Sequence, residues 1–338
     1  MAVTMKDIAR VTGLGLATIS KYYNGGSVRA KNQKLIEDAA RSLGYVPNEI
    51  ARSLKTKHTY TIGVVIPELS NVFITSIIST MEDLLRQKGY AVIVCDCRSN
   101  PELEKEAVSF LLRKQVDGLI NMPYDVTGDH LRPAIEAGTP VVLVDRILKP
   151  LEGQVPAVVL DNVDAAEQGT RFLLQQGHRN IGLVLGDRGF YTTECRLQGY
   201  LNAFSGFGVP VREENIRCGN YTMNGGYTAA KQLLALPEPP TALFVTNFEM
   251  TLGVMLALRE AGIRIPEDLS VMGFDKMDLF GEIFPDLTLV RQPQDAIGLQ
   301  TARLMLELLS PSGNTAPGTI TLSAQLHRGK STRELQNP

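Results

Sequence analysis

The 338-residue chain has no tryptophan, only four cysteines and no apolar run long enough to span a membrane. The cysteines (Cys95, Cys97, Cys195 and Cys218) form no CxxC pair and have no histidine at metal-ligand spacing. This pattern favours free thiols in a reducing compartment over a disulfide framework or a zinc site. We expect neither a metal nor a cofactor.

Export signals and catalytic motifs are missing as well. The N-terminus lacks an apolar segment followed by a cleavage site, so we expect the protein to stay in the cytoplasm. No complete GxGxxG, P-loop, GxSxG or HExxH motif occurs. The four histidines (His58, His130, His178 and His327) fall in separate segments, where we expect surface or capping positions. These absences speak against an enzyme.

Charge is distributed unevenly along the chain. Residues 1–57 contain ten Lys/Arg and four Asp/Glu, a net charge of +6, while the whole chain carries −2, so the remainder is near −8. A small basic module joined to a larger acidic body is typical of a protein whose basic part contacts the phosphates of nucleic acid.

The basic segment shows the apolar spacing of short helices separated by glycines. Thr4–Asp7 has the form of a capping box, and helices are predicted over Lys6–Val11, from Leu16 to Tyr23, and over Lys31–Leu43. Their small core should consist of Ile8, Ala9, Leu14 and Ile19.

The first two of these helices have the spacing of a helix-turn-helix. The second would present short side chains that can approach base edges in the major groove, namely Leu16, Ala17, Thr18, Ser20 and Lys21. Helix–glycine–helix patterns are common, however, so a helical domain with a merely solvated polar face stays open at this point.

From residue 61 onward, short apolar runs alternate with amphipathic segments. Strands are predicted at Ile62–Ile66, Ala91–Val94, Gly118–Ile120, Val141–Val144, Val158–Leu160, Ile181–Leu185, Ala242–Val245, Ser270–Phe274 and Thr288–Val290. Helices are predicted between most of them, for example at Thr75–Lys88, Ala165–Gln176, Leu197–Phe207 and Leu252–Ala261. This alternation predicts an α/β fold of parallel sheets flanked by helices.

The alternation divides into two similar units, which predicts a two-lobed body. We place a helix-turn-helix head at residues 1–46 and one or two further helical turns with a linker at 47–60. The N-lobe is expected at 61–160 plus 292–320, and the C-lobe at 161–291 plus 321–331. Ligands of open α/β sheets bind beyond the carboxyl ends of the strands, and here these ends also face a cleft between lobes.

Polar and aromatic residues follow several predicted strands. The candidates are Asn71, Phe73, Asp145, Arg146, Arg196, Asn247 and Asp275, with Arg196 expected at the start of a helix. Carboxylates, amides, guanidinium groups and an aromatic face together suit sugar hydroxyls and ring C–H groups. Each also has a structural alternative: Asp275 as a turn cap, Asp145 and Arg146 as an internal ion pair, and Phe73 as core.

Ordered sequence motifs identify a family more specifically than the apolar periodicity does. "MKDIARVTGLGLATISKYYNG" and "RSLGYVPNEIARSLK" resemble the lac/gal repressor family of bacterial transcription regulators. The resemblance continues through "IGVVIPELSN", "KQVDGLI", "VVLVDR", "GHRNIGLV", "VMGFD" and "LTLVRQP" to "HRGKSTRE". It implies a periplasmic-binding-protein-like body with an all-α DNA-binding head.

The resemblance also implies roles at matching positions. Leu16, Ala17 and Lys21 would contact bases, Leu54 would be a wedge in the minor groove, and residues 49–55 would be a hinge helix that folds on the operator. The full predicted DNA surface is Thr4, Lys6, Leu16, Ala17, Thr18, Ser20, Lys21, Asn24, Tyr45, Leu54 and Lys55.

This chain departs from the family's pattern at three positions. Gly15 replaces a common N-cap serine, which weakens the start of the recognition helix. Lys21 replaces a frequent arginine and offers a point charge in place of a bidentate fork. Phe248 follows Asn247 where the family usually has aspartate, so we count Phe248 among the effector residues and expect an altered effector preference.

The predicted function is that of an allosteric transcription regulator, most simply a repressor. It would act as a homodimer on pseudo-palindromic double-stranded operator DNA and respond to a small molecule, a sugar or sugar derivative, between the lobes. Three alternatives stay open: control by a phosphorylated carrier protein, a solute-binding protein for transport, and an enzyme of sugar metabolism.

Overall fold

The computed structural model describes residues 3–23, 26–46, 58–275, 287–310 and 318–335. The chain divides into two compact units, a head of residues 1–60 and a body of residues 61–338. The predicted hinge helix, with Leu54 and Lys55, and the predicted phosphate contact Asn24 lie outside the described residues. No helix within the described ranges combines the length and apolar character needed to cross a bilayer.

The head contains the three predicted helices, α1 (Met5–Thr12), α2 (Leu16–Tyr23) and α3 (Ala30–Leu43). The Asp7 carboxylate begins α1 by accepting hydrogen bonds from the Thr4 backbone N–H at 3.0 Å and the Thr4 hydroxyl at 2.8 Å. These bonds lower the pKa of Asp7. Gly13 ends α1 in the left-handed conformation (φ 68°), which turns the chain toward α2.

The core of the head differs partly from the prediction. Ile8 and Ile19 are fully buried, as expected. Ala9 and Leu14 pack against the core from its edge, and the remaining buried positions, Ile36 and Ala39, come from α3. The third helix therefore closes the core that the first two cannot complete.

The first lobe is a six-stranded parallel sheet in the order β11-β5-β4-β3-β1-β2. Its strands are β1 (Thr61–Ile66), β2 (Ala91–Asp96), β3 (Gly118–Asn121), β4 (Val141–Val144), β5 (Ala157–Leu160) and β11 (Thr319–Leu322). One face packs on α5 (Val72–Gln87) and α12 (Gln294–Leu308). The other packs on α6 (Pro101–Arg113), the short helix η1 (Asp129–Leu131) and α7 (Arg132–Glu136). A further short helix, η2 (Lys149–Leu151), follows β4.

The second lobe repeats this plan with strand order β12-β10-β9-β8-β6-β7. Its strands are β6 (Ile181–Leu185), β7 (Ile216–Cys218), β8 (Ala242–Val245), β9 (Ser270–Phe274), β10 (Thr288–Arg291) and β12 (Gln325–His327), the last antiparallel to β10. One face packs on α8 (Asn162–Gln175) and α9 (Tyr191–Gly206), the other on α10 (Met223–Leu234) and α11 (Phe248–Glu260). A short helix, η3 (Glu213–Asn215), precedes β7.

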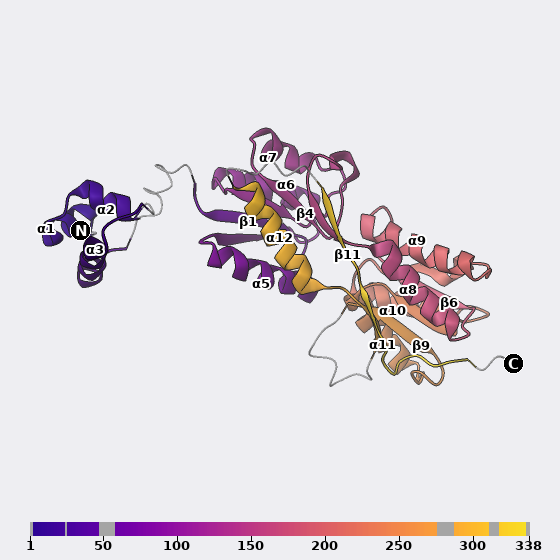
Figure 1. Cartoon of the computed structure of the whole chain (residues 1–338). Helices are drawn as coiled ribbons and strands as arrows, with labels where there is room; N and C mark the ends of the chain where they lie inside the picture. Colours follow the sequence, from indigo (N-terminus) through magenta and orange to yellow (C-terminus); the bar gives the residue numbers. More distant parts are fainter. Residues whose placement is uncertain (1–2, 24–25, 47–57, 276–286, 311–317, 336–338) are drawn as a thin grey trace. The chain divides into compact units, whose positions relative to one another are not determined.

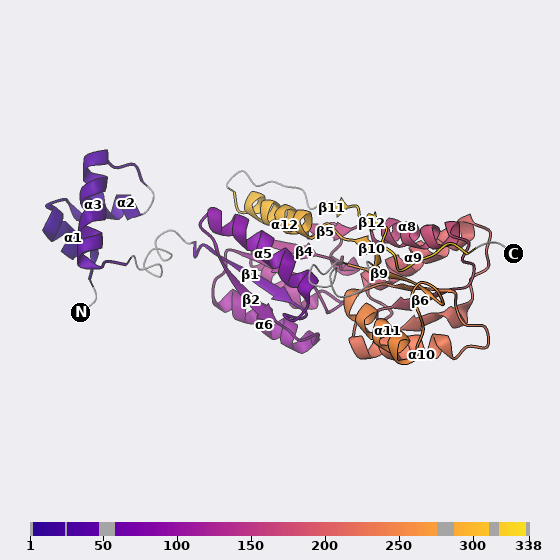
Figure 2. The same ribbon diagram turned by 90° about the horizontal axis from the view of Figure 1, so that it is seen from below.

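The chain crosses between the lobes three times, from β5 to α8, from β10 to α12 and from β11 to β12. Figure 1 and Figure 2 show α12 lying along α5 in the first lobe and β11 leading toward the second. The strands of the first sheet are parallel, and in the second sheet β12 is antiparallel to its neighbour. In each sheet the carboxyl ends of the parallel strands therefore lie at one edge, where polar residues can gather.

Three sequence-based expectations are wrong in detail. Helix α9 begins at Tyr191, so Arg196 lies inside a helix and not at its start. His130 and His178 are buried, not on the surface. His178 bonds to Thr241 and Ser270, and the polarity of these partners explains how a histidine is accommodated in the core.

Candidate functional site

A cavity of about 630 Å³ lies between the two lobes, beyond the carboxyl ends of strands in both sheets. Its wall includes seven predicted effector residues, namely Asn71, Phe73, Asp145, Arg146, Arg196, Asn247 and Asp275. Phe248 is the first residue of α11 and is half-buried, but it is not among the residues that line the cavity. The structure thus brings together all the predicted positions except that one.

Arg196 is held rigidly at the floor of the cavity. Its side chain is buried, and Nε donates to Oδ1 of Asn162 at 2.8 Å while Nη1 donates to the Thr246 carbonyl. The guanidinium also stacks on the Phe274 ring, 3.9 Å from its centroid. These contacts fix a cationic donor in place before any ligand enters.

Asp275 and Gln292 form a second polar pair on the wall. Gln292 donates from Nε2 to Oδ1 of Asp275 at 2.6 Å, and its own Oε1 is buried with no hydrogen-bond partner in the described part of the chain. Burial raises the pKa of Asp275 to about 7, although the charge of Arg196 and the Gln292 bond act to lower it. An orphaned buried acceptor beside a carboxyl group is a place where a ligand hydroxyl would be stabilised.

Two asparagines at helix starts also face the cavity. Asn71 caps α5 by accepting from the Ile74 N–H at 3.1 Å, and Asn247 caps α11 by accepting from the Met250 N–H at 2.8 Å. Asn247 also donates to Glu249, whose pKa is raised by burial. Each amide oxygen is thus committed to its helix, which fixes the orientation of the side chain.

Arg146 links the two lobes across the cavity. It pairs with Asp145 at 3.4 Å and donates to the Pro123 carbonyl at 3.2 Å. Its guanidinium lies 4.6 Å from the centroid of the Phe190 ring and 5.6 Å from that of Tyr221, both in the second lobe. The cavity therefore has aromatic faces beside its charged groups.

Sequence reasoning missed the other residues of the cavity wall, among them Tyr124, Tyr221 and Gln292. Gln292 directly follows β10, so the rule used for the other strand ends could have found it. Tyr221 follows the unpredicted strand β7 and has a positive φ of 54°. A side chain at Gly186 would place its Cβ 1.9 Å from the Tyr221 ring, so this glycine leaves room for the ring.

The head exposes part of the predicted DNA surface. Leu16, Ala17 and Lys21 are exposed on α2, while Thr18 and Ser20 are half-buried. Thr4 and Lys6 are exposed at the start of α1. Tyr45 is half-buried against Tyr23, with ring centroids 5.2 Å apart, so it packs on the core as well.

Among the described residues, no group of three or more His, Cys, Asp or Glu side chains is placed to hold a metal ion. Cys95, Cys97, Cys195 and Cys218 are free thiols, in agreement with the sequence-based prediction.

Comparison with known proteins finds a matching family for the head and for the body. A family described as bacterial regulatory proteins, lacI family, matches residues 4–48. A second, described as periplasmic binding proteins and sugar binding domain of LacI family, matches residues 59–330. Catabolite control protein A of Priestia megaterium is 35% identical over 312 residues, covering 92% of this chain and 93% of that protein.

Solved structures show the same likeness. The lac repressor dimer bound to operator and the anti-inducer ONPF has a TM-score of 0.85 and 29% identity, covering 98% of this chain and 100% of its own. The complex of the transcriptional regulator CelR with cellobiose has a TM-score of 0.73 and 29% identity, covering 97% and 99%. The chain therefore belongs to the lacI family of bacterial regulatory proteins and is a transcription regulator with a helix-turn-helix head and a periplasmic-binding-protein-like body.

Proposed function

We propose that this regulator acts in the cytoplasm as a homodimeric repressor, whose affinity for a pseudo-palindromic operator depends on a carbohydrate bound between its lobes. The single observation that carries the effector proposal is the cluster of Arg196, Asp275 and Gln292 on the cavity wall. A hydroxyl group both donates and accepts, so it can donate to the Asp275 or Gln292 oxygen while it accepts from the guanidinium.

The rest of the cavity suits the same class of ligand. The rings of Phe73, Tyr124 and Tyr221 lie on its wall and can stack on the C–H face of a sugar. Its volume of about 630 Å³ lies within the usual range for small-molecule sites, roughly 300–1,000 Å³. The cellobiose complex of CelR supports a saccharide for this chain also.

Operator binding is assigned to the head. Leu16, Ala17 and Lys21 on the exposed side of α2 would contact bases, and Thr4, Lys6, Thr18, Ser20, Asn24 and Tyr45 would contact phosphates. Leu54 would wedge into the minor groove, with Lys55 beside it.

A homodimer follows from the geometry of DNA recognition, because one helix-turn-helix covers only a half-site. The first lobe offers a surface for a second copy. The edge strand β2 exposes Val94, and the adjacent helix α6 exposes Leu103 and Phe110, each with 37–39% of its surface accessible. Apolar side chains gathered at a sheet edge favour association.

Two experiments test this function. Selection of binders from random duplex DNA at two salt concentrations, without added ligand, should enrich a pseudo-palindrome. Salt-sensitive binding without an enriched sequence would mean either that operator binding needs a co-repressor or that the head is a nonspecific basic module. A thermal-shift screen with neutral monosaccharides and disaccharides, including cellobiose, should identify a stabilising sugar. Turnover of that sugar by the purified protein would instead indicate an enzyme.

A further inference from the structure

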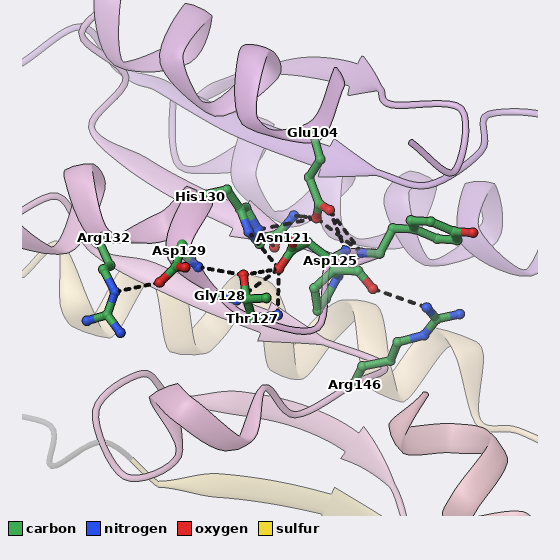
Figure 3. A network of polar contacts seen from close by, with 11 residues as sticks. Glu104, Asn121, Asp125, Thr127, Gly128, Asp129, His130, Arg132 and Arg146 are labelled. Carbon is green, nitrogen blue, oxygen red and sulfur yellow. Dashed lines mark hydrogen bonds and ion pairs between the residues drawn. The ribbon is translucent and has the colours of Figure 1, made fainter. Parts of the chain in front are cut away.

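A buried carboxylate lies behind the wall of the cavity. Glu104 is on the inner side of α6, and none of its surface is accessible to solvent. Its Oε1 accepts hydrogen bonds from Nδ2 of Asn121 at 3.0 Å and from the Tyr124 N–H at 3.1 Å, and its Oε2 accepts from the Asp125 N–H at 2.7 Å (Figure 3). Burying a carboxylate costs free energy unless hydrogen-bond donors surround it. These three donors offset that cost and tie the backbone of Tyr124 and Asp125 to Glu104.

Tyr124 and Asp125 belong to a loop of residues 122–128 that follows β3. The Asp125 side chain holds the C-terminal end of this loop. Its Oδ1 accepts from the Thr127 N–H at 2.6 Å and from the Gly128 N–H at 3.0 Å. The buried His130 ring lies between the two carboxylates, with Nε2 3.3 Å from Oε1 of Glu104 and Nδ1 3.7 Å from Oδ1 of Asp125 (Figure 3). Hydrogen bonds from the loop backbone to these two carboxylates thus hold its inner side.

The outer side of this loop forms part of the cavity. Its Pro123 carbonyl accepts the hydrogen bond from Arg146, which Figure 3 shows reaching the loop from the side away from Glu104. The Tyr124 ring contacts Phe190 of the second lobe, with centroids 5.2 Å apart. A shift of the loop backbone would therefore displace the Tyr124 ring and the carbonyl that accepts from Arg146, and both side chains line the cavity.

We propose that Glu104 is a positioning residue, which shapes loop 122–128 and through it places Tyr124 and Arg146 at the effector cavity. Glu104 does not line the cavity itself, and it acts through the backbone amides of Tyr124 and Asp125 and the carbonyl of Pro123. The inference rests on the proposed function only in taking this cavity as the effector site. Its test needs no effector, so it can fail while the sugar screen succeeds.

The test compares Glu104→Gln with the matched control Glu106→Gln, an exposed glutamate on the same helix. Glutamine keeps the volume but replaces one acceptor oxygen with an NH₂ group that faces backbone N–H groups. The full-length protein is labelled with 3-fluorotyrosine, and the resonances of Tyr124 and Tyr221 among the ten tyrosines are assigned with Tyr→Phe variants.

Glu104→Gln should shift the Tyr124 resonance, and the Tyr221 resonance through Arg146, whereas Glu106→Gln should shift neither. In Glu104→Gln, amide exchange in peptides spanning 122–128 should quicken about tenfold or more, as expected when bonds to a charged acceptor are lost. Unchanged resonances, or shifts across the lobe that accompany a general loss of thermal stability, would overturn the positioning role.

A measurement on the unmodified protein covers the case in which Glu104→Gln fails to fold. The Tyr124 and Asp125 amides lie in a loop, yet they should exchange as slowly as the amides of β3, because Glu104 holds them. Exchange at the rate of an open loop would contradict the proposal.

Discussion

At the scale of single residues, two aspartates mark equivalent places in the two lobes. Asp145 follows β4 and Asp275 follows β9, and both have a positive φ, 70° and 72°. A left-handed conformation is strained for most side chains, though aspartate tolerates it. Both line the cavity, so the two turns place a carboxyl group at matching strand ends of the two lobes.

The raised pKa of Asp275 predicts how the free energy of unfolding depends on pH. Because burial raises this pKa from 3.8 to about 7, the folded protein binds the proton more tightly than the unfolded chain does. Its contribution to the free energy of unfolding therefore falls as pH rises from about 4 to about 7. Asp275→Asn should gain stability relative to wild type over this interval, as measured by urea unfolding, and a difference independent of pH would contradict the assignment.

The lowered pKa of His178 predicts a pH dependence of the opposite sign. Burial lowers its pKa from 6.5 to about 4, and its ring bonds to Thr241 Oγ1 at 2.9 Å and to Ser270 Oγ at 3.1 Å. The unfolded chain binds the proton more tightly, so the unfolding free energy should fall by about 1 kcal/mol per pH unit from about pH 6.5 down to about pH 4.

His178→Gln should remove this acid sensitivity, while the control His327→Gln should keep it. Urea unfolding at several pH values measures both. Equal acid sensitivity in wild type and His178→Gln would show that other groups are responsible.

At the scale of elements, the sequence predicted the interior of the fold better than its borders. Strands β4, β6, β8 and β9 have the predicted bounds, because continuous apolar runs are buried on both faces. The strands that were not predicted, β7, β11 and β12, are all at sheet edges and are half-exposed, so they carry no apolar run.

The candidate site was predictable to a similar extent and for a related reason. Residues that directly follow apolar strands, such as Asp145 and Asp275, could be found because the end of the run is visible. The start of α9 was not visible, since the polar and β-branched residues of Tyr191–Arg196 hide it. The orphaned oxygen of Gln292 and the burial of Glu104 depend on distant residues, which a single sequence does not bring together.

Helix α2 is the element on which operator recognition depends, and Lys21 is its exposed cation. Because Lys21 is assigned to bases, Lys21→Ala should weaken operator binding by about 1–3 kcal/mol and relax the base preference at its position in the half-site. Lys34→Ala, an exposed lysine on α3, removes the same charge from the head and is the matched control. Equal loss in both variants would mean that only the net charge of the head matters.

At the scale of the whole molecule, the body is built so that a small ligand can change the relation between its lobes. Three crossings of the chain join the lobes, and the cavity draws its wall from both. A ligand shifts such an equilibrium only by its differential affinity for the two arrangements. We expect that difference to come from Arg196, which is held in one lobe, and from Arg146, which contacts aromatic rings of the other.

The most direct test of this account is the operator affinity of the full-length protein, measured by fluorescence anisotropy with increasing amounts of the best sugar from the screen. The affinity of the wild type should change by roughly 5- to 150-fold at saturation. Arg196→Lys, which keeps the charge but loses the planar fork, should bind the operator as well as wild type without sugar and respond little to it. An operator affinity that saturating sugar leaves unchanged in the wild type would contradict the account.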